Sequence, residues 1–155
     1  EDILKDTIGS VREISNNISP HNLNNYGLVS AIKSFIEREK KLVEINFEEN
    51  LNDYRLPRII EIMCYRIVKE MINNTIKYAR AQEVWISLSI EDKMFYLSYR
   101  DDGIGFDVEE AIENQKTGIG LLNILNRLNT LKATYSFKGK LGEGFNFEMK
   151  LRLFS

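Results

Sequence analysis

The sequence predicts a two-layer α/β sandwich of the α+β kind, in which a mixed, mostly antiparallel sheet is covered on one face by three helices. After residue 20, three segments repeat their apolar residues at helical spacing, and shorter segments alternate apolar with polar residues. Several of the short segments follow one another in pairs across turns, so we expect antiparallel hairpins. A sheet with one wet face needs helices on its other face only.

The first part of the chain is predicted to be helical. Residues 2–17 place a narrow stripe of apolar side chains at helical spacing, and Pro20 ends this pattern. A second helix is expected over residues 23–41, with Asn24 and Asn25 as candidate N-caps. These helices lead into the part of the chain that forms the sheet.

One strand and the longest helix come next. Residues 43–47 alternate Val, Ile and Phe with polar residues, which is the period of a strand. Pro57 stands where the first turn of a helix tolerates proline, and residues 57–79 keep a helical apolar period. We expect this long helix to be the best-defined element.

The second half of the chain contains both hairpins. Residues 84–90 and 94–99 alternate on either side of a short polar turn, which predicts the first hairpin. A glycine-rich segment follows, and residues 119–131 then predict a helix. Residues 134–137 and 145–153 predict the second hairpin across a glycine-rich turn.

Composition bounds the class of protein. The chain has 155 residues, of which 43% are hydrophobic and 28% charged, which suits one folded domain and not a disordered chain. The formal charge of −2 gives no overall basic field, so we expect no direct contact with nucleic acid. Any anionic ligand must therefore be held by local groups.

The single cysteine, Cys64, falls among apolar residues of the long helical pattern, so we interpret it as core packing and not as a reactive thiol. A chain that forms no internal disulfide suits the cytoplasm. The chain does not begin with Met, and no apolar run approaches the ~20 residues that span a bilayer. We expect a cytoplasmic fragment of a larger protein.

A first polar group lies on the long helix. Glu70, Asn74, Lys77 and Tyr78 project within an arc of roughly 100 degrees beside the apolar stripe. The Asn74 amide oxygen suits Mg²⁺, which takes few protein ligands, while Lys77 can reach phosphate oxygens. Tyr78 offers a flat ring against a base. An ordinary solvated helix face explains these four residues equally well when they are taken alone.

A second group, Asp101-Asp102-Gly103-Ile104-Gly105, directly follows a strand. Gly103 and Gly105 let the backbone approach a ligand closely, and the Asp101 carboxylate can accept from an exocyclic amine such as that of adenine. By itself this pattern is more often a simple turn.

A third group, Thr117-Gly118-Ile119-Gly120-Leu121, opens the helix predicted over residues 119–131. Unpaired backbone N–H groups and the helix dipole favour a phosphate there, and Gly118 and Gly120 let an anion come near. A glycine hinge in a loop is the alternative. Residues 107–116, between the two glycine segments, form a short polar stretch that could fold over a nucleotide as a lid.

The order of these groups resembles one known family, the catalytic and ATP-binding domain of bacterial sensor histidine kinases, which shares a superfamily with DNA gyrase and mismatch-repair ATPases. Residues 69–79 resemble its asparagine box, residues 101–105 its first glycine box and residues 118–121 its second. Gly142-Glu143-Gly144 stands at the place of its last G-x-G, although Phe145 replaces the usual small hydroxyl residue. The resemblance spans roughly residues 24–153.

This resemblance implies a role for each group. Asn74 would hold Mg²⁺, Asp101 would bind the adenine amino group, and Glu70 would polarise the attacking group or support the metal. Lys77 and the backbone of residues 118–121 would bind phosphates, with Tyr78 against the base or ribose. The implied site has Glu70 and Asn74 as catalytic residues and binds ATP through Asn74, Lys77, Tyr78, Asp101, Gly103, Gly105, Thr117, Gly118, Ile119, Gly120 and Leu121.

The amino-terminal stretch resembles a subfamily. Residues 14–32 are similar to the end and exit of the second dimerisation helix in kinases that partner helix-turn-helix response regulators. The resemblance divides the chain into residues 1–19, the end of that helix, and residues 20–155, the catalytic domain. His21 follows Pro20 at a helix exit, so we interpret it as a surface histidine and not as the phosphoacceptor.

The implied activity is that of an ATP:protein-histidine phosphotransferase. The γ-phosphoryl group would pass from ATP–Mg²⁺ to a histidine of the protein's own dimerisation domain, upstream of Glu1, and then to a response regulator. The parent protein would be a homodimer with or without a membrane anchor. This fragment would bind ATP without autophosphorylating. The alternatives are an anti-sigma-type serine kinase, a non-catalytic nucleotide-binding module, and an ATPase of the gyrase or mismatch-repair type.

Overall fold

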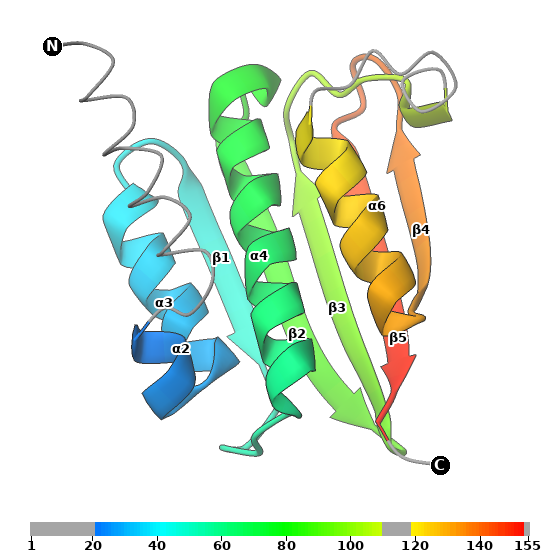
Figure 1. The fold of residues 1–155 in the computed structure, drawn as a ribbon. Coiled ribbons are helices and arrows are strands. Elements are labelled where there is room, and N and C mark those ends of the chain that lie inside the picture. Colours follow the sequence, from blue (N-terminus) through cyan, green and yellow to red (C-terminus); the bar gives the residue numbers. More distant parts are fainter. Residues whose placement is uncertain (1–20, 110–118, 154–155) are drawn as a thin grey trace, which may run out of the picture.

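A single sheet forms one layer of the molecule (Figure 1). The computed structural model describes residues 21–109 and 119–153, within which five strands lie in the order β1-β2-β3-β5-β4. The edge strand β1 (Glu44–Glu49) is parallel to β2 (Glu83–Glu91), and every other neighbouring pair is antiparallel. The remaining strands are β3 (Met94–Asp101), β4 (Thr134–Gly139) and β5 (Phe145–Arg152). The predicted mixed, mostly antiparallel sheet is confirmed.

Helices cover one face of this sheet. Figure 1 shows α3 (Leu28–Glu39), α4 (Arg58–Asn74) and α6 (Ile119–Leu131) side by side in front of the strands, as the sequence predicts. In the described ranges, no helix combines the length and the apolar character that a membrane crossing requires. The helix predicted over residues 2–17 lies outside the described residues.

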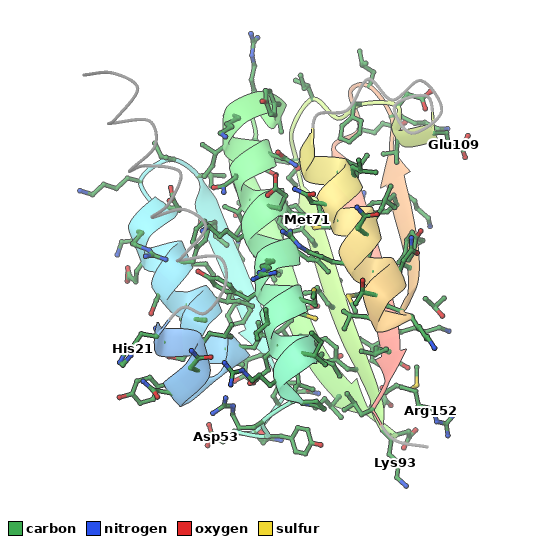
Figure 2. The ribbon with its side chains drawn as sticks, in the orientation of Figure 1. His21, Asp53, Met71, Lys93, Glu109 and Arg152 are labelled. Atoms are coloured by element: carbon green, nitrogen blue, oxygen red, sulfur yellow. The ribbon has the colours of Figure 1, made fainter. Side chains whose placement is uncertain are left out.

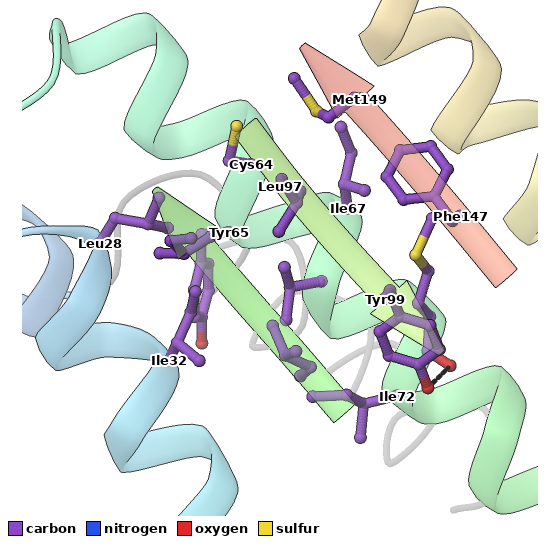
Figure 3. Packing of buried hydrophobic residues seen from close by; sticks show 14 of the residues in the cluster. Leu28, Ile32, Cys64, Tyr65, Ile67, Ile72, Leu97, Tyr99, Phe147 and Met149 are labelled. Carbon is purple, nitrogen blue, oxygen red and sulfur yellow. Dashed lines mark hydrogen bonds between the residues drawn. The ribbon is translucent and has the colours of Figure 1, made fainter. Parts of the chain in front are cut away.

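The alternation of the strands explains the core. On β2 and β3 every second residue, including Ile86, Leu97 and Tyr99, is buried against the helices, while the residues between them face away. Figure 3 shows this buried layer between α4 and the strands, with Cys64 inside it. Cys64 is fully buried, so its interpretation as a core residue is confirmed.

The hairpin between β2 and β3 closes through two residues, Asp92 and Lys93. Both have positive φ angles, 50° and 66°. A two-residue loop with this backbone follows the right-handed twist of the flanking strands, so the pairing continues to the end of both strands.

The helix predicted over residues 23–41 is divided in the structure. Gly27, with a φ of +94°, separates α2 (His21–Tyr26) from α3. A Cβ at this position would also lie 2.7 Å from the Arg55 side chain, so both the backbone conformation and the available space favour glycine. Asn24 and Asn25 lie inside α2, and the prediction that they cap a longer helix is wrong.

The long helix changes its winding near its end. The segment η1 (Thr75–Ala79) is a π-helical turn that continues α4, and Arg80 ends it with a φ of 52°. A π turn is wider than an α turn and rotates the side chains that follow it. The α-helical arc predicted for Lys77 and Tyr78 therefore does not apply to them.

The elements that carry the predicted site reach one end of the sheet. In Figure 1, η1, the end of β3, the start of α6 and the start of β5 lie at the same end of the molecule. Glu109 lies at that end, whereas Asp53 and Lys93 mark the opposite end (Figure 2).

Candidate functional site

Asp101 is the last residue of β3, and its carboxylate is only 4% exposed. Its Oδ1 accepts a hydrogen bond from the backbone N–H of Gly103 (2.9 Å), and its Oδ2 accepts from the Thr75 hydroxyl (3.0 Å). A carboxylate has about four lone-pair directions. Asp101 can therefore accept a further hydrogen bond from an amine of a ligand.

Asp102 has a different position. Its side chain is exposed, and its Oδ1 accepts from the backbone N–H groups of Gln82 and Glu83 at 2.9 and 3.0 Å. It thus ties the end of β3 to the start of β2. Of the two adjacent aspartates, only Asp101 faces the inner layer.

Two glycines after Asp101 mark close contacts between backbones. A Cβ on Gly103 would overlap the carbonyl group of Ala79 in η1, and the N–H of Ile104 donates to that same carbonyl (2.7 Å). Gly105 has a φ of +68° and meets the carbonyls of Lys140 and Gly144. The first glycine segment therefore lies between η1 and the loop before β5, with no room for side chains.

The last G-x-G closes against the same segment. Gly144 has a φ of +73° and touches the Asp101 carbonyl, while the Gly142 N–H donates to the Ile104 carbonyl (2.5 Å). Phe145 follows and is the direct cross-strand partner of Asp101. Its ring stacks on Phe106, with centroids 5.6 Å apart.

The start of α6 touches the polar face of α4. A Cβ on Gly120 would overlap the Glu70 carboxylate and lie 3.1 Å from the Asn74 side-chain nitrogen. Glu70 and Asn74 are half-buried, and both lie against a helix start whose N–H groups lack helical partners. Amide and carboxylate oxygens suit Mg²⁺, and free N–H groups at a helix start suit phosphate. These residues fit a metal–phosphate ligand.

A positive charge accompanies Glu70 on this face. Arg127 of α6 is half-buried, and its guanidinium donates to the Arg66 carbonyl (3.5 Å). Burial lowers the pKa of Arg127, as does the charge of Arg66, whereas the Glu70 carboxylate raises it. Glu70 thus compensates part of the cost of burying Arg127.

The structure brings together half of the residues predicted for the site. Lys77 is exposed, and Tyr78 exposes 71% of its surface, so neither is held against the other groups. Ile119 begins α6, and Leu121 is buried. Thr117, Gly118 and residues 110–116 of the predicted lid lie outside the described residues. The residues that converge are Glu70, Asn74, Asp101, Gly103, Gly105 and Gly120.

Sequence reasoning assigned no role in the site to Thr75 or Tyr99. The two hydroxyl oxygens are 2.5 Å apart, and both residues are buried. Burial raises the pKa of Tyr99 far above its ordinary value, and the charge of Asp101 raises it further. The usable signal was a hydroxyl in phase with the apolar residues, four residues after Met71 on the long helix and two residues after Leu97 on the strand, since buried polar atoms need partners.

Comparisons with known proteins agree with this arrangement. Residues 60–155 match a family model described as "Histidine kinase-, DNA gyrase B-, and HSP90-like ATPase". The matched range contains all the residues that converge at the end of the sheet.

Two curated relatives are similar over most of this chain. The sensor histidine kinase ComP of Bacillus subtilis (strain 168) is 29% identical over 153 residues, which cover 97% of this chain and 20% of ComP. The oxygen sensor histidine kinase NreB of Staphylococcus carnosus (strain TM300) is 27% identical over 146 residues, which cover 93% of this chain and 42% of NreB. The chain thus spans about a fifth to two fifths of the length of these relatives.

Solved structures share the fold. The blue-light activated histidine kinase EL346 of Erythrobacter litoralis gives a TM-score of 0.67 at 18% identity, covering 92% of this chain and 44% of that one. The histidine kinase AdeS of Acinetobacter baumannii gives a TM-score of 0.62 at 19% identity, covering 99% of this chain and 80% of that one. At these identities the likeness concerns the fold alone.

Proposed function

Because this chain belongs to the family of histidine kinase-, DNA gyrase B- and HSP90-like ATPases, we propose that it binds ATP–Mg²⁺ and donates the γ-phosphoryl group to a histidine of a sensor-kinase dimerisation domain. One observation carries this proposal: a buried acceptor, Asp101, and a polar pair, Glu70 and Asn74, meet glycine-lined backbones at one end of the sheet. ComP and NreB are both sensor histidine kinases, which supports the choice of acceptor.

The base and the phosphates bind to different elements in this proposal. Asp101 accepts a hydrogen bond from the exocyclic amine of adenine, while the first turn of α6 donates backbone N–H groups to phosphate oxygens. Lys77 and Tyr78 are exposed and free to turn toward the phosphates and the base. Gly118 and Thr117 extend the phosphate-binding backbone upstream of α6.

Asn74, with Glu70 beside it, holds the metal. Bound Mg²⁺ supplies charge neutralisation for the phosphate oxygens. Phosphoryl transfer needs positioning and charge neutralisation more than a strong base, so the task of Glu70 is to keep Asn74 and the attacking group in place. The contact of both side chains with Gly120 supports this arrangement.

The larger assembly follows from the same proposal. Residues 1–19 end the second dimerisation helix, and residues 20–155 form the catalytic domain of a cytoplasmic unit. The parent protein is a homodimer that phosphorylates a response regulator with a helix-turn-helix output domain. The similarity to ComP and NreB over more than nine tenths of this chain supports this view.

Nucleotide titration by calorimetry tests the binding site. Asn74→Ala should abolish the magnesium-dependent part of ATP binding, and Asp101→Asn should weaken binding of ATP strongly. Asn73→Ala is the matched control, because it removes the same side chain one position away on the helix. Equal effects at positions 73 and 74 would count against the assigned site.

A phosphotransfer assay tests the acceptor. This chain, the histidine-bearing dimerisation domain and ATP labelled at the γ-phosphate are mixed, and acid-labile phosphohistidine is measured. The chain alone should give no label. ATP binding without labelled histidine would contradict the proposal, and label on serine would instead indicate an anti-sigma-type kinase.

A further inference from the structure

Three buried polar groups form a chain of hydrogen bonds behind the candidate base site. The Tyr99 hydroxyl of β3 lies 2.5 Å from the Thr75 hydroxyl, which in turn lies 3.0 Å from Asp101 Oδ2. Tyr99 is 1% exposed, and Thr75 and Asp101 are 4% exposed. Figure 3 shows Tyr99 within the packed layer between α4 and the sheet, with a hydrogen bond at its hydroxyl.

The number of available protons gives this series of hydrogen bonds a direction. An ionised Asp101 only accepts, so the one hydroxyl proton of Thr75 goes to Asp101. The 2.5 Å contact then needs the Tyr99 proton, and Tyr99 donates to Thr75. The Tyr99 hydroxyl also donates to the Met71 carbonyl at 3.1 Å, which has a lone pair left beside the one that accepts the backbone N–H of Thr75. The single proton of Tyr99 is thus shared between the Met71 carbonyl and the shorter contact with Thr75.

The carboxylate of Asp101 is held from two sides by this arrangement. Thr75 binds Oδ2 and the Gly103 N–H binds Oδ1, so the terminal torsion of the side chain, which is otherwise broad, is restricted. Phe145, directly across on β5, has no polar side-chain atom to offer. Among the described residues, Thr75 is thus the side-chain donor that orients Asp101.

We propose that Thr75 and Tyr99 are positioning residues for base recognition, which hold Asp101 as a fixed acceptor and so select a purine with a 6-amino group over one with a 6-carbonyl. This rests on the proposed function. An acceptor in a fixed position forms a hydrogen bond with a 6-amino group, whereas its lone pairs repel those of a 6-carbonyl oxygen. A carboxylate that is free to turn can avoid this repulsion, so it discriminates less between the two purines.

The test compares ATP with inosine triphosphate, in which a carbonyl replaces the 6-amino group. Dissociation constants are measured by calorimetry for the unchanged chain, Thr75→Val, Tyr99→Phe and the double variant. We expect Thr75→Val to weaken ATP binding ~10-fold and to leave inosine triphosphate within ~3-fold. Tyr99→Phe should shift the ratio in the same direction by ~3-fold, because it acts through Thr75.

Two further variants separate positioning from simple packing. Thr75→Ser keeps the hydroxyl and should restore the ratio, and the double variant should be no worse than Thr75→Val. Equal losses for both nucleotides, or additive effects in the double variant, would overturn the inference. If Thr75→Val fails to fold, the ratio in Tyr99→Phe, with folding checked by thermal unfolding, decides the question. An unchanged chain that binds neither nucleotide would refute the proposed function instead.

Discussion

The carboxylate of Glu61 on α4 accepts a hydrogen bond from the backbone N–H of Leu28, the first residue of α3, at 3.3 Å. Glu61 is 4% exposed, and the Arg55 guanidinium binds its Oε1 at 2.9 Å. Gly27, at the N-cap position, offers no side chain to do this. One helix of the domain therefore caps another, and Arg55 compensates the buried charge.

Replacing Glu61 with Ala should destabilise the domain. The change leaves the Leu28 N–H without its partner and removes the charge that Arg55 binds, so we expect a loss of about 2 kcal/mol in the free energy of unfolding. Urea unfolding measures this. Glu37→Ala is the control, since its ion pair with Lys40 is exposed and should contribute under about 0.5 kcal/mol. Similar losses for both variants would contradict the interhelical cap.

Replacing Gly120 with Ala should separate stability from nucleotide binding. The new methyl group displaces the Glu70 carboxylate and crowds the Asn74 amide. The ends of both side chains are flexible and can move without disturbing the core. Alanine also favours a helix over glycine by up to about 1 kcal/mol. The melting temperature should therefore hold or rise while magnesium-dependent ATP affinity falls. Leu122→Ala, at an exposed position of the same helix, should leave ATP affinity unchanged.

Cys64 should resist thiol reagents in the folded protein. Burial raises the pKa of the Cys64 thiol to about 12, and the charge of Glu61 adds to this. Because the reactive form is the thiolate, iodoacetamide near neutral pH should label Cys64 only as fast as the protein unfolds. Labelling should become rapid in concentrated urea. Fast labelling of the folded chain would show that the helix layer opens locally.

The same thiol predicts a dependence of stability on alkaline pH. The pKa of Cys64 is higher in the folded chain than its ordinary value of 9.0, so folding favours the protonated thiol. This contribution is complete below pH 9.0 and is lost as pH rises toward 12. Cys64→Ala should unfold with a smaller pH dependence across this window. An identical dependence in the variant would place the alkaline transition elsewhere.

The single tryptophan should report on the face of the sheet opposite the helices. Trp85 lies under Arg100, with the guanidinium carbon 4.0 Å from the ring centre, and both residues line a hollow of about 250 Å³ together with Ser87 and Ser98. Arg100→Met should shift the fluorescence and cost about 0.5–1 kcal/mol of stability. Lys138→Met, two strands away, should change neither. Since Trp85 faces away from Asp101, ATP should leave the fluorescence of the unchanged chain unaltered.

The residue pattern alone was enough for most of the fold. Alternation identified the strands and, on β2, β3 and β5, the buried residues, because exposure repeats every second residue in a sheet. Helical spacing identified α3, α4 and α6, and short turns paired the hairpins. The glycines at 103, 105 and 120 were also visible in the sequence. In the structure Gly103 and Gly105 lie against neighbouring backbone with no room for a side chain, and Gly120 lies against the side chains of Glu70 and Asn74.

Tertiary contacts decided the rest, because periodicity reports the local environment of a residue and not its distant partner. The break at Gly27 follows from Arg55 and Glu61, and the π turn at Thr75 appears where that residue bonds Asp101. Hydrogen bonds between Thr75 and Tyr99, or Leu28 and Glu61, join positions 24 and 33 residues apart. Such contacts exist only once the sheet and helices have packed, since burial then requires every polar atom to find a partner.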